Sequence, residues 1–262
     1  MITKEKYKEV YEYVRGEKDD LRARVILEEL LTKYNFKTVL DVGSGNPHKK
    51  HSSIFEKCGK EVHTCDMTPE YYPTYEGNFL EIESKIPNNY YDCIWCSHTL
   101  EHQINPGVFL NVLKKKLKEG GILALTVPPM KHYIVPGHVN HWTPGMLLYN
   151  LVTVGFDCSK AITWAPSPDK FKGNTNSIHP YDISVLVLKK EINWEVVNKE
   201  FSTIYKDTWG DASVYEGVLY LSGKGLKYIK KYFPSKIEWT AKGKEDKDQQ
   251  FDGRNVSQII IK

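Results

Sequence analysis

Short apolar runs alternate with amphipathic stretches along the first two thirds of the chain. Residues 3–16 and 20–34 carry apolar side chains at helical spacing, and further helices are predicted near 109–117 and 143–154. The apolar runs that indicate strands are 38–42, 62–65, 92–96, 122–127, 161–164 and 183–188. Strands that alternate with helices predict a mostly parallel sheet covered by helices on both faces, which is a Rossmann-like α/β domain.

This pattern suggests three parts. We expect an N-terminal helix in residues 1–19 as a candidate lid, a main α/β domain in residues 20–190, and a C-terminal extension in residues 191–262. The extension is rich in Lys, Tyr and Gly, and its structural signals are an amphipathic stretch at 226–233 and a short apolar end at 259–261. The sequence leaves the role of the extension open.

The composition is typical of a soluble globular protein, with 40% hydrophobic and 26% charged residues. The net charge of +3 gives little support to nucleic-acid binding, and we expect the Lys-rich run 114–118 to be the solvated side of a helix. No apolar run reaches the roughly 18 residues that cross a bilayer, and the charged N-terminus does not resemble a secretory signal. Five cysteines in a chain of this length favour a reducing, cytoplasmic location.

The strand predicted over 38–42 ends in a Gly-Ser-Gly turn at 43–45, with Asp41 before it. Glycines at such a turn let the backbone approach a ligand closely, and open α/β sheets bind ligands at the carboxyl ends of their strands. The third glycine of a dinucleotide fingerprint is replaced here by His48, and the turn lacks the Gly-Lys-Ser/Thr of a phosphate loop. These features favour a nucleoside ligand that lacks phosphates.

The same turn resembles motif I of class I S-adenosylmethionine-dependent methyltransferases, D-x-G-x-G-x-G, with Pro47 in place of the last glycine. Residues 92–102, DCIWCSHTLEH, resemble motif IV in its Leu-Glu-His version. Three further segments are similar to the family: 113–121, which resembles the helix that ends in L-K-P-G-G; 137–144, which resembles H-x-x-x-(F/W)-T-P; and the Gly-Phe pair at 155–156. The resemblance covers about residues 20–190. It implies a seven-stranded Rossmann-like sheet, a helix capped by the glycines at 120–121, and S-adenosyl-L-methionine as the cofactor.

The resemblance also implies residues that hold this cofactor. An acidic residue at the end of the second strand, here Asp66, accepts hydrogen bonds from both ribose hydroxyls, which suits a carboxylate. Asn78 takes the place of the usual Asp beside the adenine, and Met67 is expected to pack against the adenine face. The predicted cofactor-binding residues are Asp41, Gly43, Ser44, Gly45, Asp66, Met67, Asn78, Phe79, Ser97 and His98.

Histidines follow both the fourth and the fifth predicted strand, where substrates of this fold meet the cofactor. A hydroxyl acceptor needs a base, and histidine is the usual base near neutral pH. The catalytic candidates are His102, His138 and His141, and the sequence does not choose among them. No metal site is predicted, although a divalent cation that assists O-methylation stays open as an alternative. The string HTLEH at 98–102 is not expected to form a zinc peptidase site, because it follows a strand instead of lying in one helix.

The predicted function is S-adenosylmethionine-dependent O-methylation of a small molecule, such as a sugar or nucleotide-linked sugar. Aromatic side chains near the predicted acceptor site, at Trp142, Trp164 and Tyr133, suit a carbohydrate. The alternatives are an RNA or other nucleic-acid methyltransferase, although (D/N)-P-P-(Y/F) is missing after the fourth strand, and a non-catalytic cofactor-binding protein. His48 disfavours a nicotinamide oxidoreductase. The expected partner is a small-molecule acceptor, with no nucleic acid and no membrane, and a homodimer stays open.

Overall fold

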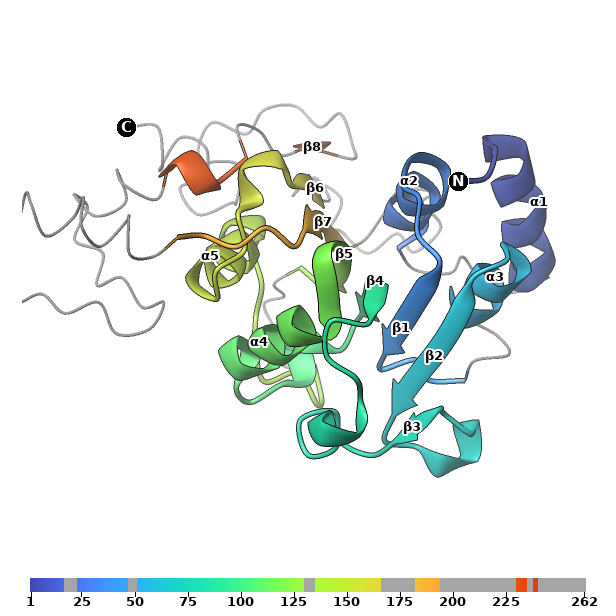
Figure 1. The fold of residues 1–262 in the computed structure, drawn as a ribbon, viewed down its shortest axis with the longest axis horizontal. Helices are drawn as coiled ribbons and strands as arrows, with labels where there is room; N and C mark the ends of the chain where they lie inside the picture. Colours follow the sequence, from blue (N-terminus) through green and yellow to red (C-terminus); the bar gives the residue numbers. More distant parts are fainter. Residues whose placement is uncertain are drawn as a thin grey trace, which may run out of the picture.

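The structure is a computed structural model that describes residues 1–16, 23–46, 51–129, 135–165, 182–193, 230–234 and 238–239. Within these residues eight strands form one sheet in the order β3-β2-β1-β4-β5-β7-β6-β8 (Figure 1). The strands are β1 Thr38–Val42, β2 Glu61–Asp66, β3 Tyr75–Glu76, β4 Tyr91–Ser97, β5 Leu117–Val127, β6 Ile162–Ala165, β7 Ile183–Leu188 and β8 Glu238–Trp239. The α-helices are α1 Lys4–Arg15, α2 Arg24–Lys33, α3 His51–Lys57, α4 Pro106–Lys116 and α5 Pro144–Thr153.

The sheet is parallel from β3 to β5 and mixed beyond β5. Strand β1 pairs in parallel with β2 and β4, and β4 pairs in parallel with β5. Strand β7 runs antiparallel between β5 and β6. The chain moves outward from β1 to β2 and β3 and then returns to the other side of β1 at β4. The carboxyl ends of β1 and β4 therefore form a topological switch point, where open α/β sheets bind ligands.

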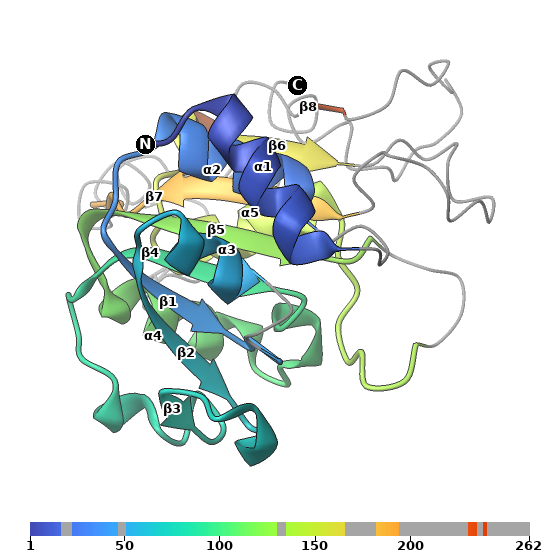
Figure 2. The same cartoon turned by 90° about the vertical axis from the view of Figure 1, so that its right-hand side faces the viewer.

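Helices cover both faces of the sheet (Figures 1 and 2). Helices α1, α2 and α3 share one core cluster with the sheet, in which Leu30, Phe55 and Trp95 are fully buried. Helices α4 and α5 share the other cluster, which contains Phe109 and Leu147. This arrangement confirms the Rossmann-like α/β fold. No helix in the described part of the chain has the length and apolar character to cross a membrane.

Helix α1 is packed into the domain. Thr3 caps its first turn, because the Thr3 side chain accepts a hydrogen bond from the Lys6 N–H. Tyr7 and Tyr11 are buried against α2 and α3, and the Tyr7 hydroxyl donates to the Arg24 carbonyl oxygen at 3.1 Å. Packed in this way, α1 forms part of the core on one face of the sheet, while a lid role for residues 1–19 stays a prediction.

The two glycines at 120–121 do not cap helix α4, so that prediction was wrong. The helix ends at Lys116, and β5 begins at the next residue. Two interactions fix the end of the helix. The buried Lys116 ammonium donates to the Glu83 and Ile86 carbonyl oxygens, and Leu117 pairs with a residue of β4. Gly120 lies inside β5 with a φ of 71°.

Part of the C-terminal extension joins the sheet. Strand β8 pairs in parallel with β6 at the edge of the sheet, and Phe233 is buried in the cluster that contains α4 and α5. The sequence did not predict β3, β8 or α3, each of which has seven residues or fewer. Residues 226–229 of the amphipathic stretch at 226–233 and all of the apolar end at 259–261 lie outside the described residues.

Asp92, near the start of β4, holds together the amino ends of two strands. Its carboxylate accepts hydrogen bonds from the backbone N–H groups of Lys37 and Thr38 and from the Lys118 ammonium, at 3.0, 2.9 and 2.7 Å. Burial by itself would raise the pKa of Asp92. The hydrogen bonds from these partners outweigh burial and lower the pKa to about 2. The charged form of Asp92 therefore stabilises the fold.

Replacing Asp92 with Ala is expected to lower the free energy of unfolding by about 1–3 kcal/mol at pH 7. Because the pKa is lower in the folded state, this contribution is fully present above the unfolded pKa of about 3.9 and is lost as the pH falls through about 2. Urea unfolding of both proteins at pH 7 and pH 3 measures the difference. An equal gap at both pH values would contradict the ionic origin.

Candidate active site

The turn after β1 is a left-handed loop that reaches towards β2. Gly43 and Gly45 have φ values of 74° and 58°, which glycine adopts without strain. The backbone N–H groups of Gly43 and Ser44 donate to the Cys65 carbonyl oxygen at 2.8 and 3.2 Å. The turn is thereby fixed beside the carboxyl end of β2. Pro47 and His48, which sequence analysis singled out, lie outside the described residues.

Asp66 ends β2 and faces this turn. Its Oδ2 accepts a hydrogen bond from the Gly45 N–H at 2.7 Å, and its Oδ1 accepts one from the Thr68 N–H at 2.9 Å. A carboxylate offers about four acceptor positions, so two remain for an outside donor pair. The side chain is partly exposed, unlike the buried Asp41. This geometry suits the two hydroxyls of a ribose.

Of the next three predicted cofactor-binding residues, two have side chains that are available for a contact with the cofactor. Met67 is 69% exposed and lies next to Asp66 in the chain, so its side chain is accessible to a flat ring. The Asn78 side-chain oxygen accepts from the Leu80 N–H at 3.1 Å, which leaves its amide N–H groups for another partner. Phe79 is buried edge-on against Phe109, with ring centroids 5.2 Å apart. A contact of Phe79 with the cofactor would therefore come from its backbone.

Asp41 supports the turn from inside the protein. It is 2% exposed on β1, and its carboxylate accepts a hydrogen bond from the Ser52 hydroxyl of α3. Ser44 is also buried, at 4% exposure. The Asp41–Ser52 hydrogen bond joins the strand to the helix, and the accessible part of the turn is its glycine backbone.

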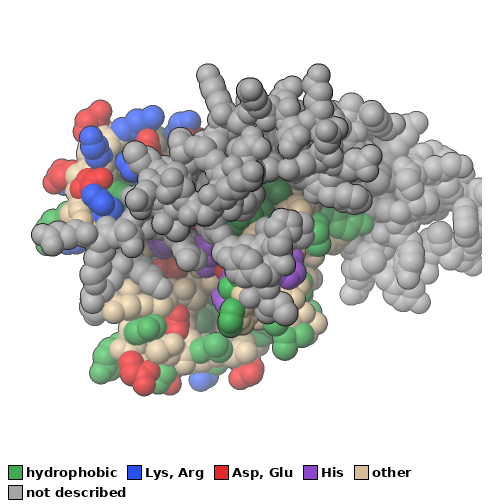
Figure 3. Space-filling view, turned by 180° about the vertical axis from the view of Figure 1, so that it is seen from behind, with side chains coloured by type: hydrophobic (Ala, Val, Ile, Leu, Met, Phe, Trp, Pro, Cys, Tyr) green, Lys and Arg blue, Asp and Glu red, His purple; other side chains and the backbone are tan. Residues whose placement is uncertain are grey.

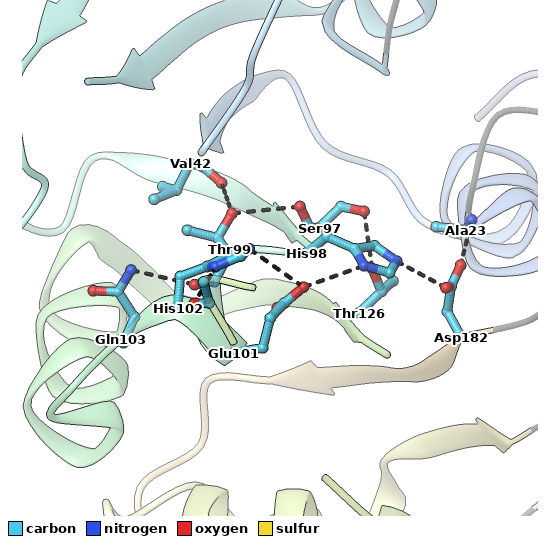
Figure 4. A network of polar contacts seen from close by, with 11 residues as sticks. Ala23, Val42, Ser97, His98, Thr99, Glu101, His102, Gln103, Thr126 and Asp182 are labelled. Carbon is cyan, nitrogen blue, oxygen red and sulfur yellow. Dashed lines mark hydrogen bonds and ion pairs between the residues drawn. The ribbon is translucent and has the colours of Figure 1, made fainter. Parts of the chain in front are cut away.

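The loop after β4 packs directly against the turn after β1 (Figure 4). The Thr99 hydroxyl donates to the Val42 carbonyl oxygen at 3.1 Å, and a Cβ built on Gly43 would lie 2.0 Å from that hydroxyl oxygen. The Ser97 hydroxyl forms a 2.9 Å hydrogen bond with the Thr126 hydroxyl on β5. Three neighbouring strand ends are thus linked at the switch point.

His98 lies between two buried carboxylates (Figure 4). Its Nε2 is 2.8 Å from Asp182 Oδ1, and its Nδ1 is 3.2 Å from Glu101 Oε1. The other Asp182 oxygen accepts from the Ala23 N–H at the start of α2. Burial lowers the pKa of His98, but the two carboxylates outweigh it, and the net effect is a raised pKa. Both ring nitrogens face protein, so the side chain links the loop after β4 to Asp182 at the start of β7.

The string at 98–102 does not form one helix, which agrees with the sequence analysis. Strand β4 ends at Ser97, His98 has a left-handed φ of 54°, and a 3-10 turn follows at Leu100–His102. The arrangement of a helical zinc peptidase is therefore absent from this described segment.

The loops after β4 and β5 are joined by backbone hydrogen bonds. The Glu101 carbonyl oxygen accepts from the N–H groups of Val139 and Asn140 at 2.9 and 3.2 Å. The His102 Nδ1 atom is 2.7 Å from the Gly137 carbonyl oxygen, and a carbonyl only accepts, so Nδ1 carries the proton. In the neutral ring, Nε2 then holds a lone pair.

These contacts bring together two of the three predicted catalytic histidines. The rings of His102 and His138 meet edge to face with their centroids 5.0 Å apart. His141 is exposed three residues further on, and His132 lies outside the described residues. In the space-filling view, histidine side chains gather in the middle of one face with acidic side chains beside them (Figure 3).

The predicted aromatic acceptor surface is not formed by the two tryptophans. Trp142 and Trp164 are 2% and 7% exposed and belong to the two core clusters, and Tyr133 lies outside the described residues. Trp164 lies on the buried strand β6, and Trp142 comes just before helix α5, which explains their burial. The sequence analysis also missed Asp182, because no local pattern links it to His98, 84 residues away.

The fold is a Rossmann-like α/β domain in which the loop after β4 connects the glycine turn at 43–45 with the histidine pair. A protein family described as a methyltransferase domain matches residues 12–161, which is more than half of the chain. The chain therefore belongs to this methyltransferase domain family. No curated protein matches the sequence.

Two solved structures share the fold. A SAM-dependent methyltransferase from Archaeoglobus fulgidus has 19% sequence identity and a TM-score of 0.50, over 70% of this chain and 99% of that one. A chain in the complex between the Haloferax volcanii Trm112 methyltransferase activator and a methyltransferase has 14% identity and a TM-score of 0.52, over 73% of this chain and 100% of that one. At these identities the likeness concerns the fold.

The cofactor of the chain is S-adenosyl-L-methionine, and the described residues fit it. Asp66 keeps two acceptor positions for a ribose, the glycine backbone of the turn is accessible, and an exposed Met67 follows. When bound, this cofactor supplies an electrophilic methyl group on a sulfonium.

Proposed function

We propose that the chain methylates a hydroxyl group of a small polar molecule. The predicted cofactor-binding residues fall into two groups according to their surroundings. The backbone of the turn at 43–45, Asp66, Met67 and Asn78 would contact the cofactor, while Asp41, Ser97 and His98 would hold the surrounding loops in place. The acceptor would lie over the joined loops after β4 and β5.

One observation carries this proposal: the short loop after β4 contacts both the turn at 43–45 and His138. Thr99 packs on Gly43 in the turn, and three residues later His102 meets His138. An acceptor hydroxyl at the histidine pair would therefore lie close to a methyl group held at the turn. Alignment of donor and acceptor is the main requirement of an in-line displacement.

The reaction releases one proton, which comes from the acceptor hydroxyl. The acceptor oxygen forms a C–O bond to the methyl carbon as the S–C bond breaks, and the S–C electron pair stays on sulfur. The products are a methyl ether and S-adenosylhomocysteine. We place the binding of the hydroxyl, and the loss of its proton, at the pair His102 and His138.

A small acceptor fits the charge distribution better than a nucleic acid does. Among the described side chains on the face that carries the histidines, Lys and Arg lie mainly towards one edge, next to acidic ones (Figure 3). With a net charge of +3, this offers little electrostatic attraction for a phosphate backbone. Sugars and nucleotide-linked sugars remain the proposed class. Polar groups of the two loops would recognise them, because the two tryptophans are buried.

Replacing His102 or His138 with Ala is expected to lower kcat at least about 100-fold, within the range of acid–base contributions, with little change in cofactor affinity. Methyl transfer from radiolabelled S-adenosylmethionine to a panel of sugars, nucleotide sugars and phenols measures the effect. His141→Ala in the same series tests the third candidate.

His63→Ala is the matched control, because His63 lies on β2 and its Nδ1 is 2.9 Å from the Tyr91 hydroxyl, away from the joined loops. Equal loss of activity in the control would assign the effect to folding. Turnover of phenols with no turnover of any sugar would reject the carbohydrate class, and salt-sensitive methylation of RNA would overturn the small-molecule proposal.

A further inference from the structure

Three ligand-type side chains converge where the loops after β4 and β5 meet. Glu101, His102 and His138 each place one potential ligand atom within 4.8 Å of the others. We propose that these three residues bind a divalent transition-metal ion, with zinc as the best match. This inference rests on the proposed function, because it concerns the place where the acceptor hydroxyl would lose its proton.

The first argument is the buried charge of Glu101. Its side chain is fully buried, and neither carboxylate oxygen has a partner with hydrogen-bond geometry, although His98 Nδ1 lies 3.2 Å from Oε1. Burying such a group without compensation is costly. Asp182 is also buried beside His98, so Glu101 shares this imidazole with a second carboxylate. A divalent cation would give the Glu101 carboxylate a partner of its own.

The second argument is the orientation of His102. Its Nδ1–H donates to the Gly137 carbonyl oxygen, which fixes the tautomer that leaves Nε2 as a ligand atom. Metal-binding histidines usually make this kind of hydrogen bond through the other ring nitrogen. His102 Nε2 lies 3.9 Å from Glu101 Oε1. Ligands about 2.1 Å from a tetrahedral zinc lie roughly 3.4 Å apart, so small side-chain rotations would complete the site.

The third argument is that hydrogen bonds join the two loops that carry the ligand side chains. The Glu101 carbonyl oxygen accepts from Val139 and Asn140, and the Asn140 side chain donates to the Gln103 carbonyl oxygen. Gly137 has a φ of 83°, and a Cβ built there would lie 3.4 Å from His102 Nδ1. The segments that carry the three ligand side chains are therefore joined to each other through backbone hydrogen bonds.

The ligand set selects the kind of metal. Two imidazoles and one carboxylate suit zinc and its first-row neighbours, whereas magnesium and calcium prefer oxygen ligands alone. Three protein ligands leave a coordination position open, as in catalytic zinc sites. An acceptor hydroxyl bound there would have a lowered pKa and would release its proton to water before the C–O bond forms.

The test is zinc binding to full-length protein that was purified with a chelator and then dialysed free of it. Calorimetric titration with ZnCl2 is expected to show one zinc per chain, and the bound metal should raise Tm. His102→Ala and His138→Ala are expected to weaken zinc affinity at least about 10- to 100-fold, whereas His63→Ala keeps it. His102 is 43% exposed at its side chain, so its removal should leave the fold intact.

Each variant is also titrated with S-adenosylhomocysteine, which reports an intact fold independently of zinc. Absence of zinc binding in protein that binds S-adenosylhomocysteine would overturn the metal site and leave the proposed function standing. Zinc bound through these residues, with no methyl transfer to any hydroxyl acceptor, would keep the metal site and overturn the proposed function. Zinc binding that survives both histidine substitutions would place the metal elsewhere and contradict the inference.

Discussion

Replacing Gly43 with Ala is expected to lower the free energy of unfolding by about 2–5 kcal/mol and to abolish cofactor binding. Two effects add at this position. The φ of 74° is unfavourable for alanine, and the new Cβ would lie 2.0 Å from the Thr99 hydroxyl oxygen and 2.9 Å from Thr99 Cγ2. Relief of this clash requires the loop after β4 to move away from the turn. Urea unfolding and calorimetric titration measure the two outcomes.

Gly59→Ala is the matched control for this substitution. Gly59 has nearly the same φ, 75°, but nothing lies within 4 Å of a Cβ built there. The difference between the two variants therefore isolates the clash with Thr99 from the backbone strain. If Gly43→Ala were no more destabilising than Gly59→Ala, the close packing of the two loops would be contradicted. Thr99→Ala in the Gly43→Ala background should restore part of the stability.

Replacing Asp66 with Ala is expected to weaken S-adenosylmethionine binding at least about 100-fold, which corresponds to about 2.7 kcal/mol. The substitution removes the acceptor proposed for the ribose and also the acceptor for the Gly45 and Thr68 N–H groups. Hydrogen bonds to a charged group contribute about 1.5–3 kcal/mol each, so the loss of two ligand bonds accounts for the expected effect.

Glu76→Ala is the control for Asp66→Ala. Glu76 is an exposed carboxylate on β3 that pairs in register with Asp66, so its removal makes the same change in net charge at the same edge of the sheet. Cofactor affinity is expected to stay within about twofold of the wild type. Equal weakening by both substitutions would assign the effect to long-range charge and not to contact with the ribose.

The central part of the fold is predictable from the sequence because each element carries its own signal. The run at 38–42, in which Val39, Leu40 and Val42 are apolar, is buried at every position, and the glycines that follow adopt the left-handed φ values that their type permits. Strands β4, β6 and β7 likewise lie within one or two residues of the predicted apolar runs. The covering helices have apolar faces that are wide enough to be recognised.

The remaining features depend on contacts between distant residues. Asp182 lies beside His98 because β7 pairs with β5. No local sequence pattern around either residue predicts this contact. The glycines at 120–121 resemble a helix cap, yet the burial of Lys116 ends α4 four residues earlier. The tryptophans predicted to face an acceptor belong to the two core clusters instead, and Trp164 lies within β6.

The candidate site likewise has a part that the sequence predicts and a part that depends on contacts between distant residues. Strand ends that meet at a switch point bring Asp66 and the turn at 43–45 together, and topology alone predicts this. Which of the candidate histidines lie together could not be predicted from the sequence. Only the structure shows that Gly137 fixes the His102 ring and that His138 lies against it.

The most direct test of the account is isothermal titration of the purified protein with S-adenosylmethionine and S-adenosylhomocysteine, with NADH as the comparison ligand. The account predicts one site of about micromolar affinity for both adenosyl compounds, loss of that site in Asp66→Ala, and no binding of NADH. Binding of NADH with no response to either adenosyl compound would contradict it, because the turn at 43–45 would then serve a dinucleotide.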